Sequence, residues 1–412
     1  MKPSVAVKLG VSSLLMFAVS CGQAKMPQDS SVDGHYEKFG EKQAEPYIGK
    51  QVVVPEYDPV ESVVISLPLI EGFGKEDLVE AILDAGAKKV FVTVESYRSD
   101  MTTNSKTLAR LKNMLGQDIE KIELVPQSKG GDLTVWARDW APLGALSKNN
   151  DSLGPVLVDF NYYPDRKSDD ATAISMEKSF NYDRVSVPVY NEGGNFMTNS
   201  RGECLMTTRV TDANEEAYTR DDMILDEDQI ADYYEKFAGC TKVTIFPRMP
   251  YEGTGHIDMW GKFLDDDTVI VGEILPETRD LAVREGGAAE SFTGRIATYL
   301  DERSLDLENL GYKVKRIPMP LPDDYAIRSY TNSLLINGVA LVPRYHLGFD
   351  PDNFTDYSYA DGQLQSSYEA KVREAYESLG YTVKFIDSDE LIAYGGAIHC
   401  VTMQLPAASS SL

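Results

Sequence analysis

Two stretches of the chain, "LDLENLGYKVKRIPMP" (residues 305–320) and "KVREAYESLGYTVKFID" (residues 371–387), decide the fold. Each reads as a helix that stops at a glycine and continues at once into a strand. Because a glycine after a helix supplies the left-handed C-terminal cap, Gly311 and Gly380 predict helix ends. The same pattern predicts further helix ends at Gly86, Gly116 and Gly239. A helix–strand unit therefore recurs along the chain.

A glycine-rich turn follows three of these helix ends at an interval of fourteen or fifteen residues. The turns open "GGDLTVWARDW" (130–140), "GTGHIDMW" (253–260) and "GGAIHC" (395–400), and we expect each to lead into a functional strand. The segments "EGGNFMTNS" (192–200) and "SYTNSLLING" (329–338) have the same character. Repeats of this kind predict an α/β fold with blades around an axis and turns that converge at one end. A plain α/β sandwich is the alternative.

Composition and charge limit the kinds of partner. The chain has 412 residues, 42% of them hydrophobic, which is enough to bury a large core. The net charge is −25, and the sequence pI is about 4.6. A field of this sign repels phosphate backbones and anionic membrane surfaces, so we expect no nucleic-acid binding. It attracts small cations and basic peptides.

The N-terminus predicts an export signal over residues 1–21, with two lysines and then an apolar run too short to span a bilayer. It ends "AVSC" (18–21), which resembles the lipobox of bacterial lipoproteins except that Ala18 stands where leucine is usual. We expect lipidation at Cys21, with ordinary cleavage and secretion as the alternative. Residues 22–50 read as a polar tether, and residues 51–412 as one domain. We therefore expect an exported protein that lies in the periplasm or at the cell surface. Its lipid anchor would be its only contact with a membrane.

Three cysteines remain after Cys21: Cys204, Cys240 and Cys400. Three cysteines cannot all form disulfides with one another in an oxidising compartment. At least one thiol therefore stays free, and its presence in an exported protein needs an explanation. Cys204 and Cys240 are expected to be separate buried thiols, and a disulfide between them is the alternative.

The candidate catalytic residues lie in the repeated turns. Cys400 and His256 are typical of covalent catalysis by a thiolate. Asp139 and Asp258 add two carboxylates, which suit a planar guanidinium with forked N–H donors better than a neutral amide. On a strand His256 and Asp258 would share one face. They would supply only two ligands, so we expect no metal.

Each of these residues also has a plainer interpretation. Asp139 could pair with Arg138, His256 could be a satisfied core histidine, and Cys400 could be buried and inert. Four inert residues in matching turns are a weaker explanation than one site. His399 is expected to be structural, because it faces away from Cys400 on a strand.

Five motifs together resemble the bacterial peptidylarginine deiminases and agmatine deiminases of the guanidine-modifying superfamily: "VWARDWAP", "EGGN", "GHIDMWGK", "SYTNSLLING" and "GGAIHCVT". The resemblance covers about residues 51 to 407, with the motifs in order. It implies a five-bladed, pseudo-symmetric α/β propeller, the pentein fold. It also implies a deiminase that needs no cofactor and no metal.

By this resemblance Cys400 is the nucleophile, His256 the general acid and base, and Asp139 and Asp258 the clamps that hold the guanidinium. The implied reaction forms a covalent thiouronium on the cysteine, releases ammonia and leaves a ureido group. Trp136 resembles a pocket wall and Asn332 a residue lining the site. Glu192 in "EGGN" caps a turn or touches the substrate.

The loop "VDFNYYPDRKSDD" (158–170) bears on the substrate. Agmatine deiminases usually carry a tryptophan–glycine pair here, and enzymes that prefer C-terminal arginine carry two arginines. Arg166 and Lys167 match the second pattern in part, so Arg166 is the candidate for binding a carboxylate. The charged cluster would otherwise be a solvated loop.

We expect arginine in peptides or proteins as the substrate, converted to citrulline, because an exported enzyme meets peptides. Agmatine, deiminated to N-carbamoylputrescine for putrescine biosynthesis, is the alternative. Amidino transfer and a non-catalytic surface lipoprotein that binds basic ligands are two further alternatives.

Overall fold

The structure is a computed structural model that describes residues 51–95, 105–127, 132–147, 155–180, 182–217, 224–320, 327–346, 349–350, 355–356 and 361–407. The expected export signal, the lipidation site at Cys21 and the tether lie outside these residues. Within them, no helix combines the length and apolar character needed to span a bilayer.

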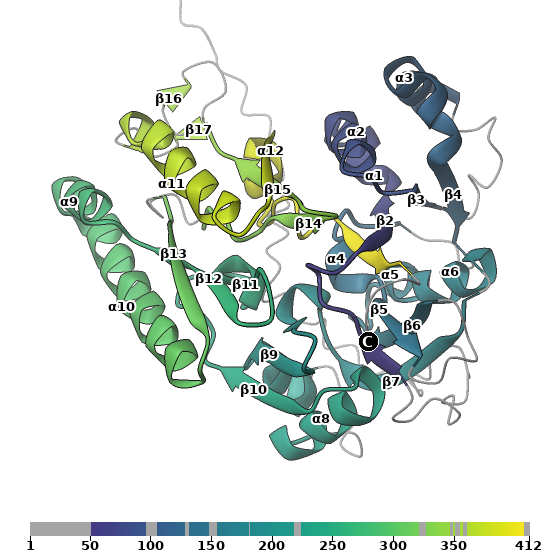
Figure 1. The fold of residues 1–412 in the computed structure, drawn as a ribbon, viewed down its shortest axis with the longest axis horizontal. Helices are drawn as coiled ribbons and strands as arrows, with labels where there is room; N and C mark the ends of the chain where they lie inside the picture. Colours follow the sequence, from purple (N-terminus) through teal and green to yellow (C-terminus); the bar gives the residue numbers. More distant parts are fainter. Residues whose placement is uncertain are drawn as a thin grey trace, which may run out of the picture.

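Five sheets of three or four strands make up the framework (Figure 1). The first contains β1 (Gln51–Val53), β5 (Leu143–Ser147), β6 (Pro155–Asn161) and β7 (Arg184–Tyr190). The second contains β8 (Met197–Thr198), β9 (Glu203–Thr207) and β10 (Lys242–Phe246), and the third β11 (Gly261–Phe263), β12 (Thr268–Glu273) and β13 (Lys313–Pro318). The fourth contains β14 (Leu334–Ile336), β15 (Val339–Arg344) and β18 (Thr382–Asp387). The fifth contains β19 (Met403–Pro406), β2 (Val60–Ser66), β3 (Lys89–Val94) and β4 (Ile122–Pro126), and β16 (Phe349–Asp350) pairs separately with β17 (Thr355–Asp356).

The same pairing scheme recurs in all five sheets. A central strand pairs antiparallel with one neighbour and parallel with the other, as β12 does with β11 and β13. In the fifth sheet the C-terminal β19 pairs antiparallel with the early strand β2, with Met403 opposite Val64. The α/β class is therefore confirmed, and Figure 1 shows the sheets following one another around the molecule. The five-bladed propeller geometry stays a prediction.

Helices cover the sheets. The longer ones are α2 (Glu76–Asp84), α3 (Ser105–Leu115), α6 (Thr172–Phe180), α8 (Glu227–Tyr233), α9 (Pro276–Glu285), α10 (Gly287–Asn309) and α11 (Gln365–Glu377). The short ones are α1 (Leu67–Glu71), α4 (Ala137–Trp140), α5 (Lys167–Asp170), α7 (Arg209–Asp212) and α12 (Asp389–Ile392). α10 packs against β12 and β13, and α11 packs against β13 and β18. Central strands such as β6 are buried along their length, as expected for strands covered on both faces.

The predicted helix ends are confirmed. Gly311 and Gly380 have φ of 99° and 88°, the left-handed region that a glycine cap requires. Gly86, Gly116 and Gly239 also have positive φ.

Cys204 and Cys240 form a disulfide with a Cα–Cα distance of 5.8 Å, so the expectation of two separate thiols was wrong. The left-handed Gly239 ends the helical turn Tyr234–Ala238 and directs Cys240 toward β9, which carries Cys204. β10 then pairs in parallel with β9, with Val243 opposite Cys204. Cys400 is the free cysteine of the described residues.

Candidate active site

Asp139, Asp258 and Cys400 lie in turns, as expected, whereas the placement of His256 and Asp258 together on a strand was wrong. Asp139 lies in the one-turn helix α4, and Asp258 lies in the 3-10 turn Ile257–Met259, which His256 precedes. Cys400 lies in the turn that leads into β19.

Three of the side chains converge on the backbone of Gly194, in the 3-10 turn Gly193–Asn195. A Cβ atom at Gly194 would lie 2.6 Å from Nδ1 of His256, 3.0 Å from Oδ1 of Asp139 and 3.1 Å from Oδ2 of Asp258. Residues from three segments that are far apart in sequence therefore surround one point of the backbone. Only glycine leaves that point free of a Cβ atom, which explains the second glycine of "EGGN".

Cys400 completes this group. Its Sγ lies 4.0 Å from Oδ2 of Asp258 and 3.2 Å from Nδ2 of Asn332, which also donates to Asp258 at 3.1 Å. A Cβ atom at Gly396 would lie 3.0 Å from the sulfur and 2.5 Å from the Trp136 ring. The indole and the thiol therefore flank the same glycine. The structure thus brings Trp136 and Asn332 beside the nucleophile candidate.

The sequence left two roles open for Glu192, and the structure places its carboxylate beside His256. Its Oε2 lies 3.1 Å from Nε2 of His256 and 2.7 Å from Nε of Arg209, and the Tyr163 hydroxyl donates to Oε1. All of these groups are buried or partly buried. The signal was present in the sequence, since the acidic residue directly precedes the glycine pair.

Comparisons with known proteins identify the family of the chain. Residues 52–406 match the model of the Porphyromonas-type peptidyl-arginine deiminase family. A Vibrio parahaemolyticus protein named "Putative agmatine deiminase" is 22% identical over 389 residues, covering 85% of this chain and 96% of that protein.

Among solved structures, the agmatine deiminase of Enterococcus faecalis has a TM-score of 0.64 at 17% identity, covering 89% of this chain and 100% of that one. A C. jejuni agmatine deiminase variant with substrate bound has a TM-score of 0.62 at 16% identity, covering 86% and 96%. These likenesses show a shared fold.

The chain belongs to the Porphyromonas-type peptidyl-arginine deiminase family. It is a hydrolase that acts on the C–N bonds of a guanidino group.

The electrostatics of the deiminase site favour the charged form of His256 and disfavour the charged form of Cys400. Burial opposes protonation of His256, but the carboxylates of Asp139 and Glu192 outweigh burial and raise its pKa to about 10. His256 is therefore a cation at neutral pH. Burial, together with the carboxylates of Asp258 and Asp139, raises the pKa of the Cys400 thiol well above its ordinary value. A positive group bound between the carboxylates would offset this effect.

Several buried polar atoms of the deiminase site have no hydrogen-bond partner. They are Oδ1 of Asp258 and both ring nitrogens of His256, although Nε2 faces Glu192. Unpaired buried polar atoms are rare in folded proteins and are costly. A guanidinium supplies the N–H donors that a carboxylate oxygen lacks.

Arg138 does not have the role that the plainer interpretation gave it. Its side chain donates from Nε to the carbonyl of His399 at 3.3 Å and from Nη2 to Oε1 of Gln404 at 2.7 Å. Its backbone N–H donates to the carbonyl of Cys400 at 3.0 Å. The arginine before Asp139 thus ties α4 to the turn that carries the nucleophile candidate.

Arg166 lies further out than the other predicted site residues. Its Nη1 donates to the Tyr162 hydroxyl at 3.0 Å, and its guanidinium lies 5.3 Å from the centre of the Tyr163 ring. Tyr163 contacts Glu192, which contacts His256. Arg166 is therefore connected to the centre of the site through two intervening side chains.

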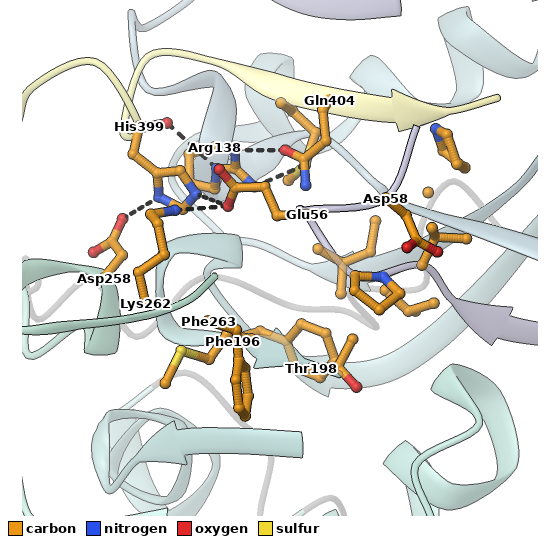
Figure 2. A pocket seen from close by; sticks show the side chains of 18 of the residues that line it. Glu56, Asp58, Arg138, Phe196, Thr198, Asp258, Lys262, Phe263, His399 and Gln404 are labelled. Carbon is orange, nitrogen blue, oxygen red and sulfur yellow. Dashed lines mark hydrogen bonds and ion pairs between the residues drawn. The ribbon is translucent and has the colours of Figure 1, made fainter. Parts of the chain in front are cut away.

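His399 contacts the site, contrary to its assignment as purely structural. Its Nδ1 lies 2.6 Å from Oδ2 of Asp258, and Figure 2 shows the imidazole between this carboxylate and Glu56. The residue directly before the thiol therefore reaches one of the two clamp candidates instead of the thiol itself.

Proposed function

We propose that this deiminase converts arginine residues of peptides or proteins to citrulline, with Cys400 as the nucleophile. One observation carries the proposal: two buried carboxylates, a cationic histidine and a free thiol lie close together beside the backbones of Gly194 and Gly396. This is the set that attack on a guanidinium carbon requires.

In the proposed mechanism Asp139 and Asp258 bind the guanidinium nitrogens and hold the central carbon near Sγ of Cys400. The positive charges of the substrate and of His256 favour the thiolate that burial disfavours. The thiolate attacks the central carbon, and protonated His256 gives its proton to the departing nitrogen, so that ammonia leaves. The carbon stays bound to sulfur as a thiouronium.

The second half returns the enzyme to its starting state. Neutral His256 takes a proton from a water molecule, which attacks the thiouronium carbon. The carbon–sulfur bond breaks, the proton of the new hydroxyl leaves to solvent, the thiolate is restored, and the product carries oxygen where nitrogen had been. Glu192 holds His256 from the side away from Asp139 and favours its protonated form.

Three observations support a peptide substrate. The matched family is named for peptidyl-arginine. Arg166 and Lys167 offer positive charge in the loop that leads to Tyr163, which suits a carboxylate and repels an ammonium. The N-terminal sequence also predicts export and lipidation at Cys21, which would place the enzyme among peptides.

Agmatine is the second candidate, because the similar proteins from several bacteria carry that name. Agmatine ends in a primary ammonium where a peptide carries carbonyl groups. The two candidates therefore make opposite demands on the charge around Arg166.

Release of ammonia from four compounds tests the proposal: a peptide with internal arginine, a peptide with C-terminal arginine, free arginine and agmatine. We expect the highest kcat/KM for a peptide, and Cys400→Ala should abolish release from all four. Turnover of agmatine alone would reject the peptide substrate. An active Cys400→Ala variant would reject the mechanism.

A further inference from the structure

A chain of buried charged groups extends from Asp258 away from the thiol. Oδ2 of Asp258 faces Nδ1 of His399 at 2.6 Å, and Nε2 of His399 faces Oε2 of Glu56 at 2.7 Å. The same Glu56 oxygen accepts from Nζ of Lys262 at 2.7 Å. Each ring nitrogen of His399 therefore faces one carboxylate oxygen.

Glu56 is anchored by the backbone as well. Its Oε1 accepts from the backbone N–H of Leu335 at 2.9 Å. Glu56 therefore joins segments that are far apart in sequence, since His399 follows it by 343 positions. Burial alone would raise the pKa of Glu56, but Lys262 and His399 hold it well below its ordinary value. Glu56 is thus an anion with a fixed position.

The same groups line a pocket (Figure 2). Glu56, Arg138, Lys262, His399 and Asp258 are among its lining residues, whereas Cys400 and His256 are not. The pocket has a cavity volume of about 50 Å³. Among the described residues, the hydrogen bonds of the His399 ring go to Asp258 and Glu56, whereas those of the thiol involve Asn332 and Asp258.

We propose that His399 and Glu56 are positioning residues for Asp258: they fix the orientation of the carboxylate that binds the guanidinium. Oδ2 is held by His399 and Asn332, and Oδ1 is buried without a partner. A carboxylate held at one oxygen cannot turn its plane away from the substrate. The inference rests on the proposed role of Asp258 as a clamp.

The variants His399→Asn and Glu56→Gln test this role, with His346→Asn as the matched control. His346 makes an equally short contact to a carboxylate, 2.7 Å from Nδ1 to Oδ2 of Asp389, but it is exposed. We expect KM for the guanidine substrate to rise about tenfold in both variants and to stay unchanged in the control, because partners that orient a binding group typically contribute this much.

A second readout separates positioning from general loss of structure. Chloroacetamidine carries the planar cation that Asp258 binds, whereas chloroacetamide is neutral and has the same leaving group. We expect the ratio of their alkylation rates at Cys400 to fall about tenfold in both variants, on the same grounds as KM. A variant that only disturbs the fold would slow both reagents together.

Lys262 would be left buried without its counter-ion in Glu56→Gln, so a double variant guards against unfolding. Glu56→Gln with Lys262→Met removes both charges and should show the same fall in the rate ratio. Folded variants with parental KM and parental ratio would overturn the inference.

Two results with the parent enzyme distinguish failure of the proposed function from failure of the positioning inference. If the parent releases ammonia from no guanidine, the proposed function fails and the alkylation ratio alone decides the inference. A parent thiol that shows no preference for the amidine would reject the clamp and the inference together.

Discussion

Two buried histidines, His256 and His399, each lie between two carboxylates, yet the contacts differ in quality. His399 lies 2.6 Å from Asp258 and 2.7 Å from Glu56, and both contacts are hydrogen bonds. His256 lies 3.7 Å from Asp139 and 3.1 Å from Glu192, and neither ring nitrogen makes a hydrogen bond.

A cation stands behind each outer carboxylate, since Lys262 binds Glu56 and Arg209 binds Glu192. The two arrangements therefore have the same kinds of neighbouring groups and differ in hydrogen bonding. A histidine with both nitrogens satisfied is held in place, whereas one with unused nitrogens can exchange a proton with a substrate. This contrast assigns positioning to His399 and chemistry to His256.

The largest effect should come from His256→Asn. Loss of the group that protonates the leaving nitrogen and activates water is expected to lower kcat about a thousandfold. The measurement is steady-state ammonia release, with His399→Asn as the comparison. If the two substitutions lowered kcat equally, the distinction between the histidines would be wrong.

The next effect concerns the clamp that His399 holds. Asp258→Asn removes the charge that binds the guanidinium and should lower kcat/KM about fiftyfold, as expected for loss of a charge-assisted hydrogen bond. Asp387→Asn, at an exposed position, is the control. Parental kinetics in folded Asp258→Asn would reject a clamp at this position.

The pH dependence of kcat/KM should distinguish the carboxylate beside His256 from the carboxylate beside His399. The pKa of His256 is raised to about 10 because the carboxylates of Asp139 and Glu192 outweigh burial, so kcat/KM should fall as pH rises through about 10. Glu192→Gln removes one of these carboxylates and should move the fall to lower pH. Glu56→Gln should leave it in place, because Glu56 contacts His399. A pH–rate profile in which both variants shift alike would contradict this assignment.

The smallest effect on activity is expected from the disulfide. A Cys204→Ala, Cys240→Ala variant should lose roughly 4 kcal/mol of unfolding free energy, because the bond closes a loop of 36 residues. Its kcat/KM should stay within about twofold of the parent, since roughly 1.4 kcal/mol separates each tenfold step and no site contact is removed. Denaturant unfolding and ammonia release measure the two quantities. Activity that falls with stability would mean that the contrast between the histidines cannot be read from kinetics alone.

Much of the site was predictable from local patterns. Asp139, His256, Asp258 and Cys400 stand in glycine-rich turns that could be recognised by their residues and spacing. The structure brings the first three together around Gly194 and places the sulfur of Cys400 4.0 Å from Asp258. Their local conformation was predicted less well, because turns and short strands share the same composition. His399 was misjudged for the same reason: the alternation of a strand does not apply in a turn.

The sequence by itself determined where helices end, as at Gly311 and Gly380, because the left-handed cap depends on one residue's φ. It also determined which chemical groups are available. Only the tertiary structure decided that Cys204 meets Cys240, that Glu192 meets both His256 and Arg209, and that Glu56 holds His399. Such pairs depend on how separate sheets pack, and no periodicity within a single segment encodes a contact between groups 343 positions apart.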